Sequence, residues 1–189
     1  MPRDTRFGGL PVEELQERAR RVRLLLSDCD GVLTDGTVYV SEHGEALKRF
    51  SLRDGMGVEL LRLAGIETAI VTRERSAIVA RRAEKLGLAV FDGVQDKAAA
   101  LPQLVAATGC ERHELAYIGD DVNDLGIIAE LGKLGLTAAP FDAATPVARV
   151  VHHLCRAGGG EGAFREFADW ILRLRAGGTE KDRTKGGRA

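Results

Sequence analysis

The chain has 189 residues, of which 44% are hydrophobic and 29% charged, with a formal net charge of −1. These values are typical of one compact soluble domain with an aliphatic core. The near-zero charge argues against a nucleic-acid binder, and no apolar run approaches the roughly 20 residues that span a membrane. The three cysteines form no C-x-x-C pair, so we expect reduced thiols in a cytoplasmic protein.

The chain alternates between apolar runs and helical patterns after a short polar helix, which is predicted over residues 12–21 within an N-terminal segment 1–21. A single domain is expected over residues 22–175. Its predicted strands are residues 22–27, 66–71, 89–91, 115–118 and 133–137. Its predicted helices are residues 57–64, 76–86, 97–108, 121–131 and 163–174. This alternation predicts an α/β fold, a Rossmann-like doubly wound parallel sheet covered on both faces.

Two segments depart from this pattern. Residues 36–50 contain two β-prone runs around Glu42-His43-Gly44, which predicts a β-hairpin projecting from the sheet after the first strand. Residues 176–189 are rich in glycine and charge and lack an apolar face, so a disordered tail is predicted there.

Acidic residues follow two of the predicted strands. Asp28 and Asp30 come after the first strand, and Asp120, Asp121 and Asp124 come after the fourth. Ligands of open parallel sheets bind beyond the carboxyl ends of the strands, so the two groups should meet at one edge. Carboxylates brought together repel one another unless a cation lies among them, and oxygen ligands suit Mg²⁺. The sequence therefore predicts a magnesium site.

A hydroxyl and an ammonium group are predicted at the same edge. Thr72 ends the second strand, and Lys97 opens the helix after the third. Together with a metal they would neutralise charge on a transferring phosphoryl group. Each feature alone is explained by a turn or a helix cap. Four such features, each after its own strand, indicate phosphoryl transfer.

The motifs resemble those of a known superfamily. The run D-C-D-G-V-L-T-D-G from Asp28, then Thr72, Lys97 and the run G-D-D-V-N-D from Gly119, resemble the four motifs of haloacid dehalogenase superfamily phosphatases. Segments at residues 48–57, 77–83 and 158–166 are similar to the 3-deoxy-D-manno-octulosonate 8-phosphate phosphatase family. The resemblance covers about residues 22–175 and implies a capless haloacid dehalogenase-like fold and a small sugar-acid phosphate as substrate.

The resemblance also implies catalytic roles. Asp28 would attack phosphorus and carry an aspartyl phosphate, while Asp30 would act as general acid and then as general base. Asp28, the backbone carbonyl of Asp30 and Asp120 would hold Mg²⁺.

Four further side chains have implied supporting roles. Thr72 and Lys97 would bind the phosphoryl oxygens, and Asp124 would orient Lys97 or a metal-bound water. For Asp121, a role at the metal and a role capping the following helix are both open.

The substrate-binding residues depart from the family pattern. The family shows T-G-R-x-S after the second strand, whereas here Arg73 replaces the glycine and Glu74 the arginine. An arginine there would bind a substrate carboxylate, which a glutamate cannot do. Glu74 together with Lys85 is similar to a related branch that acts on 2-keto-3-deoxynononate 9-phosphate or acylneuraminate 9-phosphate. Alternatively, both are ordinary surface residues of a helix. The remaining substrate-binding candidates are Arg53, Asp54, Gly55 and Arg82.

Family members resemble one another in forming tetramers, with hairpins in a central barrel and a neighbour closing each active site. The resemblance therefore implies a homotetramer built on hairpin 36–50. The glycine run at residues 158–162 either lets the following segment reach a neighbour's site or serves as a flexible linker into the last helix.

Two other function classes compete with the phosphatase. A receiver-like signalling module would place its phosphoaccepting aspartate after the third strand, and it would not need Asp30. A catalytically weak partner domain of a nucleotidyltransferase would not need intact Asp28, Lys97 and Asp120. Cys29 and Trp170 are interpreted as core residues, and His152-His153 as a solvated strand edge.

Overall fold

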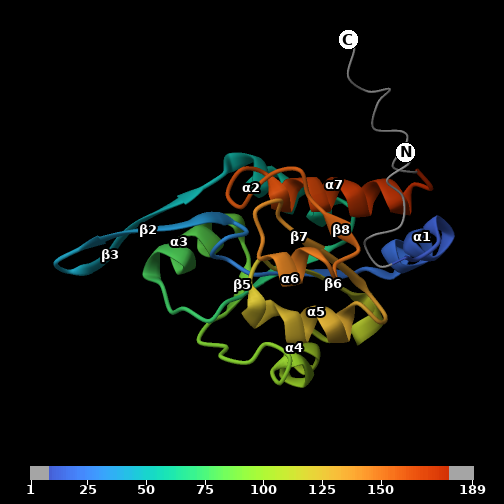
Figure 1. Cartoon of the computed structure of the whole chain (residues 1–189), viewed down its shortest axis with the longest axis horizontal. Coiled ribbons are helices and arrows are strands. Elements are labelled where there is room, and N and C mark those ends of the chain that lie inside the picture. The colour runs from blue at the N-terminus through green and yellow to red at the C-terminus, as the bar shows by residue number, and fades with distance from the viewer. Residues whose placement is uncertain (1–8, 179–189) are drawn as a thin grey trace, which may run out of the picture.

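Six parallel strands form the central sheet of the computed structural model, which describes residues 9–178 (Figure 1). The strands are β1 (Leu24–Ser27), β4 (Glu67–Val71), β5 (Ala89–Phe91), β6 (Leu115–Ile118), β7 (Leu136–Ala139) and β8 (His153–Leu154). They lie in the order β5-β4-β1-β6-β7-β8. Counted along the chain within this sheet, that order is 3-2-1-4-5-6, the Rossmann arrangement, so the predicted fold class is confirmed.

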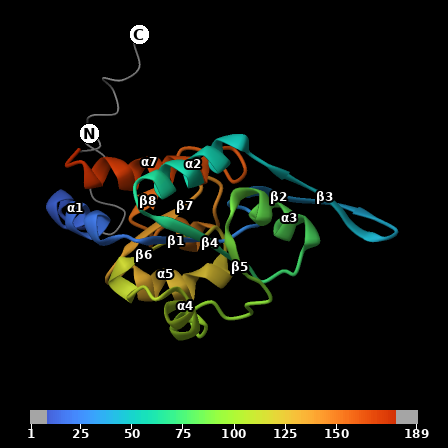
Figure 2. The same ribbon diagram turned by 180° about the vertical axis from the view of Figure 1, so that it is seen from behind.

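Helices cover both faces of the sheet (Figures 1 and 2). One face packs against α1 (Val12–Arg21), α2 (Leu52–Leu63), α3 (Ala77–Leu86) and α7 (Ala163–Arg175). The other packs against α4 (Leu101–Thr108), α5 (Leu125–Leu131) and α6 (Thr145–Ala148). Alternation along β1 explains this division, because Leu25 points into the first layer while Leu24 and Leu26 point into the second. Two 3₁₀ turns, η1 (Arg112–Glu114) and η2 (Val122–Asp124), flank β6.

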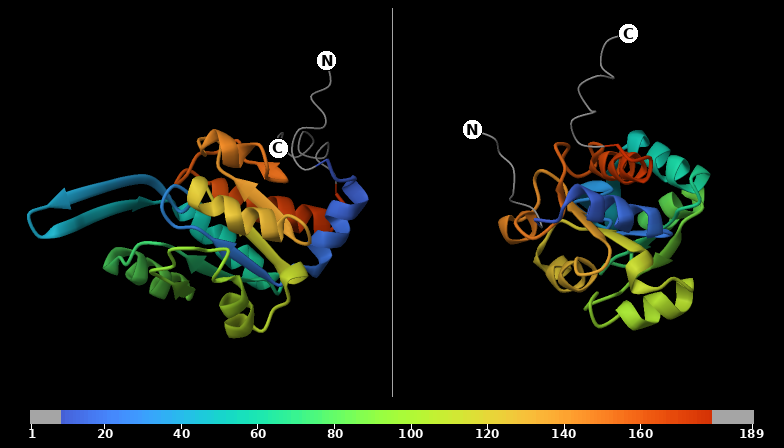
Figure 3. Two further views of the ribbon diagram at one scale, coloured as in Figure 1. Left: turned by 60° about the horizontal axis from the view of Figure 1, so that its bottom comes forward. Right: turned by 90° about the vertical axis from the view of Figure 1, so that its right-hand side faces the viewer.

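A β-hairpin of β2 (Thr34–Ser41) and β3 (Gly44–Phe50) extends away from the sheet (Figure 3). Its turn lies at Glu42 and His43, as predicted. In residues 9–178 the insertion between β1 and α2 consists of this hairpin and its connections, in agreement with a capless fold.

Several predicted boundaries were wrong. Helix α2 begins at Leu52 rather than residue 57, because the Ser51 side chain accepts a hydrogen bond from the Arg53 N–H and caps its first turn. The strand predicted at residues 133–137 lies at Leu136–Ala139, since residues 132–135 form the turn that ends α5. Strand β8 and helix α6 are two and four residues long, too short for a periodic pattern.

Cys29 and Trp170 lie in the core, as predicted, but His153 does not lie at a solvated edge. It is 5% exposed and its ring stacks on Trp170 with centroids 4.8 Å apart. The prediction for that residue was wrong because β8 is covered by α7, a packing that the short strand does not reveal.

The described residues end at Gly178, so residues 1–8 and, from residue 179 on, the predicted disordered tail lie outside them. Between residues 9 and 178, the helices are too short or too polar to cross a bilayer.

Candidate active site

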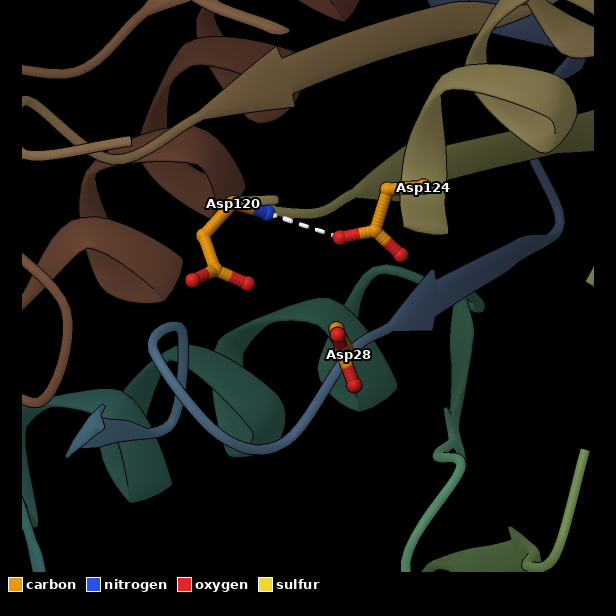
Figure 4. A group of neighbouring side chains, drawn as sticks. All are labelled: Asp28, Asp120 and Asp124. Atoms are coloured by element: carbon orange, nitrogen blue, oxygen red, sulfur yellow. Dashed lines mark hydrogen bonds between the residues drawn. The ribbon is translucent and has the colours of Figure 1, made fainter. Parts of the chain in front are cut away.

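The two acidic groups meet where the sheet order reverses. Strands β1 and β6 are neighbours, and the Asp28 N–H donates to the Ile118 carbonyl at 2.9 Å. Carboxylate oxygens of Asp28, Asp120 and Asp124 all lie within 4.8 Å of one another. Figure 4 shows the three side chains facing a shared gap. The predicted convergence of two segments about ninety residues apart is present, because both strands end at this edge.

Asp28 is almost fully buried, with 5% of its surface exposed. One carboxylate oxygen accepts from the Cys29 N–H at 2.7 Å, and the other contacts Lys97 Nζ at 2.7 Å. The neighbouring Cys29 side chain points into the core, where burial raises the pKa of its thiol. The thiol is therefore no candidate nucleophile, whereas the Asp28 carboxylate lines an open cleft.

Lys97 bridges Asp28 and Asp124. Its side chain is 1% exposed, and its ammonium group lies 2.7 Å from Asp124 Oδ1 and 2.7 Å from Asp28 Oδ2. The hydroxyl of buried Tyr117 donates to the same Asp124 oxygen at 2.6 Å, and the Asp120 N–H donates to the other at 2.9 Å. Both oxygens of Asp124 are thus engaged by the protein, an arrangement that suits support of Lys97 better than direct binding of a metal.

Burial and mutual repulsion dominate the electrostatics of the acidic group. Burial raises the pKa of Asp28 to about 7, and burial followed by the Asp28 charge raises the pKa of Asp120 to about 8. A divalent cation would offset this repulsion. Carboxylate oxygens around such a gap are ligands that Mg²⁺ prefers, so the residues fit a magnesium ion.

A cleft of about 270 Å³ opens over these carboxylates. It is lined by Asp28, Asp30, Gly31, Gly36, Thr72, Arg73, Glu74, Asp120, Asp121 and Asn123. Thr72 and Glu74 lie where the sequence analysis expected site residues. Among the lining residues of the described chain, Arg73 carries the positive charge. At Gly31 only glycine fits, because φ is +79° and a Cβ would lie 2.0 Å from an Asp120 oxygen.

Asp30 has a partner that the sequence analysis missed. Lys48 of the hairpin contacts its two carboxylate oxygens at 2.7 and 2.8 Å, and Thr34 Oγ1 lies 3.3 Å from one of them. Tyr117 was missed as well. Its only sequence signal is a hydroxyl placed in a buried strand, where it needs a hydrogen-bond partner.

Asp121 caps the turn that follows β6. Its side chain accepts from the Val122 N–H at 2.7 Å, at the start of η2. The capping role left open by the sequence is therefore observed, and the exposed carboxylate also borders the cleft.

The other predicted substrate residues lie outside the cleft. Asp54, Gly55 and Arg82 surround a small cavity beneath the base of the hairpin. Asp54 is 2% exposed and its carboxylate accepts the Arg165 N–H at 2.9 Å, which caps α7 from a neighbouring helix. Arg82 donates to the Ser51 carbonyl at 3.0 Å, so both side chains have structural partners within the chain.

Arg53 and Lys85 are both exposed, and neither lines the cleft in the described chain. Arg53 lies beside Gly162. Lys85 occupies the last turn of α3, at the opposite end from Ser76. The helix dipole favours a positive charge at that end. The structure therefore does not bring Glu74 and Lys85 together in the cleft of one chain.

The glycine run at residues 158–162 packs against the loop that follows the nucleophile. The Gly160 N–H donates to the Val32 carbonyl at 2.9 Å, and a Cβ on Gly159 would lie 2.0 Å from the Gly31 carbonyl. Of the two alternatives for this run, the flexible linker is wrong, because Gly159 and Gly160 make close backbone contacts.

Comparison with known proteins decides the family. No family model matches the chain. A 3-deoxy-D-manno-octulosonate 8-phosphate phosphatase of Yersinia pestis is 38% identical over 170 residues, 89% of each chain. The chain belongs to the 3-deoxy-D-manno-octulosonate 8-phosphate phosphatase family. It is therefore a member of a family of phosphoric monoester hydrolases, which excludes the receiver-like interpretation.

Solved structures of the family agree with the fold. A cobalt-bound phosphatase of this family from Haemophilus influenzae has a TM-score of 0.79 and 37% identity, covering 84% of this chain and 92% of that one. A Moraxella catarrhalis member in complex with magnesium, phosphate and the sugar acid has a TM-score of 0.80 and 33% identity, covering 91% and 98%. Divalent metals are thus found in structures of this family.

Proposed function

We propose that the protein hydrolyses 3-deoxy-D-manno-octulosonate 8-phosphate in a Mg²⁺-dependent reaction with an aspartyl-phosphate intermediate. The observation that carries the proposal is the Asp28–Lys97–Asp124 arrangement beside Asp120, under an open cleft. The relatives named for this substrate, and the one whose structure holds magnesium, phosphate and the sugar acid, support it.

In the first half of the reaction, an Asp28 oxygen forms a bond to phosphorus as the bond from phosphorus to the sugar oxygen breaks. Asp30 gives its proton to that oxygen. Water then attacks the phosphorus of the aspartyl phosphate and passes a proton to Asp30. The bond between phosphorus and the Asp28 oxygen breaks, so inorganic phosphate is released and Asp28 is restored. Thr72 and Lys97 bind the phosphoryl oxygens throughout.

Asp28, the Asp30 carbonyl and Asp120 would hold Mg²⁺, which supplies positive charge for the phosphoryl oxygens when bound. Turnover of the purified full chain should disappear after chelation and return with MgCl₂. Metal-independent turnover would contradict the proposal. An absence of turnover with metal would favour the catalytically weak partner domain.

One observation favours a second substrate. Glu74 lines the cleft where the family places arginine, and a glutamate accepts hydrogen bonds from hydroxyl groups. A glutamate at this place is similar to the branch that acts on 2-keto-3-deoxynononate 9-phosphate or acylneuraminate 9-phosphate, so these are the second candidate substrates. For either acid, Arg73 in the same cleft supplies a guanidinium group for the substrate carboxylate. Comparing kcat/KM for the eight-carbon and nine-carbon phosphates decides between them, and the larger value identifies the substrate.

We also propose a homotetramer in the cytoplasm. The exposed apolar side chains of the hairpin support self-association, with Val40 72% and Leu47 64% exposed. The three cysteines are buried thiols, which supports a reducing compartment. Light scattering tests the assembly, and a monomer at physiological salt would contradict it.

A further inference from the structure

Lys48 is a buried cation on an otherwise exposed hairpin strand. Its side chain is 4% exposed, whereas most residues of β3 are exposed. Its ammonium group contacts both oxygens of Asp30, at 2.7 and 2.8 Å, and an oxygen of Glu45 at 3.1 Å. An ammonium group has three donors, and these contacts account for all of them.

The register of the hairpin explains why Lys48 and Glu45, three residues apart in β3, share a face, because the pairing shifts by one residue between Tyr39 and Val40. Lys48 pairs with Val38, and Glu45 pairs with Val40, two residues further along the same strand. Side chains two apart in a strand share a face, so Lys48 and Glu45 lie on one face, while the pair Tyr39–Leu47 lies on the other.

Glu45 extends the contact to the loop between β4 and α3. Its carboxylate accepts a hydrogen bond from the hydroxyl of Ser76, which caps α3. Ser76 lies four residues beyond Thr72, on the loop after β4. The hairpin is therefore tied to the loop after β1 through Lys48 and to the loop after β4 through Glu45.

Asp30 depends on these contacts for its orientation. Its side chain is 31% exposed, and apart from Lys48 its closest partner is Thr34 at 3.3 Å. A carboxylate held at both oxygens by a charged donor keeps one orientation, whereas a partly exposed aspartate without that donor samples several rotamers. Acid–base catalysis requires the carboxyl group within hydrogen-bond reach of the proton that moves.

We propose, building on the function proposed above, that Lys48 is a positioning residue. It orients the Asp30 carboxyl group toward the leaving oxygen and toward the attacking water. The hairpin then contributes a residue to the active site, in addition to the surface proposed for assembly. Lys48 acts through Asp30 and need not touch the substrate.

Arg49, the next residue on β3, provides a matched control. Its guanidinium group pairs with Asp35 at 2.7 Å and with Glu161 at 3.3 Å, and half of the side chain is exposed. It ties the base of the hairpin to the body without contacting Asp30. Loss of one positive charge from the same strand can therefore be compared at two adjacent positions.

The test compares two leaving groups in Mg²⁺-loaded full-length protein. 4-Nitrophenolate leaves readily without a proton, whereas phenolate requires protonation, so only phenyl phosphate depends strongly on the general acid. We expect Lys48→Gln to lower kcat/KM for phenyl phosphate about tenfold more than for 4-nitrophenyl phosphate. General acid–base catalysis raises reaction rates roughly 10²–10⁴-fold, and an acid group in the wrong orientation loses part of this rate enhancement. Arg49→Gln should change both substrates equally or not at all.

Lys48→Arg should restore much of the loss, since a guanidinium fork can hold both carboxylate oxygens. An equal loss for the two substrates in Lys48→Gln, or a gain, would overturn the proposal. If Lys48→Gln fails to fold by circular dichroism, Lys48→Arg carries the test alone. It must then show a phenyl phosphate deficit smaller than tenfold but larger than that of Arg49→Gln, and any other result overturns the proposal.

The aryl phosphates separate this proposal from the proposed function. If the wild-type protein hydrolyses them but neither sugar-acid phosphate, the substrate assignment fails while the Lys48 comparison can still be read. If Asp28→Asn keeps its aryl phosphatase turnover, the aspartyl-phosphate mechanism fails instead.

Discussion

The acidic cluster at the sheet edge and the β-hairpin hold charged groups in different ways. In the cluster, Asp28, Lys97 and Asp124 are buried and bonded to one another, on segments anchored by the parallel sheet. In the hairpin, Lys48 reaches Asp30 from a two-stranded ribbon that extends into solvent. The positions of the cluster residues are therefore fixed by the core, whereas the orientation of the Asp30 side chain depends on the position of the hairpin.

This difference predicts which changes abolish chemistry, which weaken the fold and which affect assembly alone. The largest effect is expected at the nucleophile. Asp28→Asn should lower kcat by at least about a thousandfold, because an amide cannot form the phosphoryl intermediate. Steady-state turnover of 4-nitrophenyl phosphate measures this, with circular dichroism as the check on folding. Near-normal turnover in a folded variant would refute the nucleophile assignment.

Removal of the buried cation should weaken the fold as well as the activity. Lys97→Met leaves Asp28 and Asp124 without their shared partner, and loss of one member of a buried ion pair costs about 3 kcal/mol or more. Urea unfolding of the metal-free protein measures the loss of stability. Lys133→Met, on an exposed i,i+3 pair, is the control and should change it by less than about 0.5 kcal/mol. Equal effects at the two positions would contradict a special role for the buried site.

The cluster should also make stability depend on pH when no metal is bound. Burial raises the pKa values of Asp28 and Asp120 from 3.8 to about 7 and about 8 in the folded protein. Their stabilising contribution is therefore present below pH 3.8 and is lost as pH rises through these values. The free energy of unfolding, measured with urea in the presence of a chelator, should therefore decrease by about 1 kcal/mol or more as the pH rises from 5 to 8.

Magnesium should reverse that trend, because it binds the deprotonated carboxylates of the folded state. The stabilisation added by MgCl₂ should therefore grow as pH rises over the same range. Asp120→Asn should flatten the pH dependence in chelator and reduce the stabilisation by the metal. A metal-free stability that rises with pH would show that other groups dominate.

The smallest effect on the fold is expected in the hairpin. Leu47→Thr places a β-branched residue, which suits a strand, at an exposed position, so stability per subunit should change by less than about 0.5 kcal/mol. Light scattering across a dilution series should nevertheless show weaker assembly than in the wild type. Val150→Thr, an exposed apolar position outside the hairpin, is the control and should leave the assembly unchanged. Unchanged assembly in Leu47→Thr would argue against a hairpin-mediated tetramer.

The sequence by itself determined the parallel α/β fold and the meeting of Asp28 with Asp120 at one sheet edge. These features depend on strand period and on residues that directly follow a strand, both of which are local. It could not determine the start of α2, which depends on the Ser51 cap, or the existence of β8, which is defined by packing of only two residues.

Only the tertiary structure decided the partners of these residues. Lys48 of the hairpin contacts Asp30 of the loop after β1, and Tyr117 of β6 donates a hydrogen bond to Asp124 of η2. Tertiary packing likewise places the Asp54 side chain where it caps α7, and it places the glycine run in contact with the loop after Asp28. Such contacts join segments whose relative placement arises from the packing of the whole domain, which no local pattern encodes.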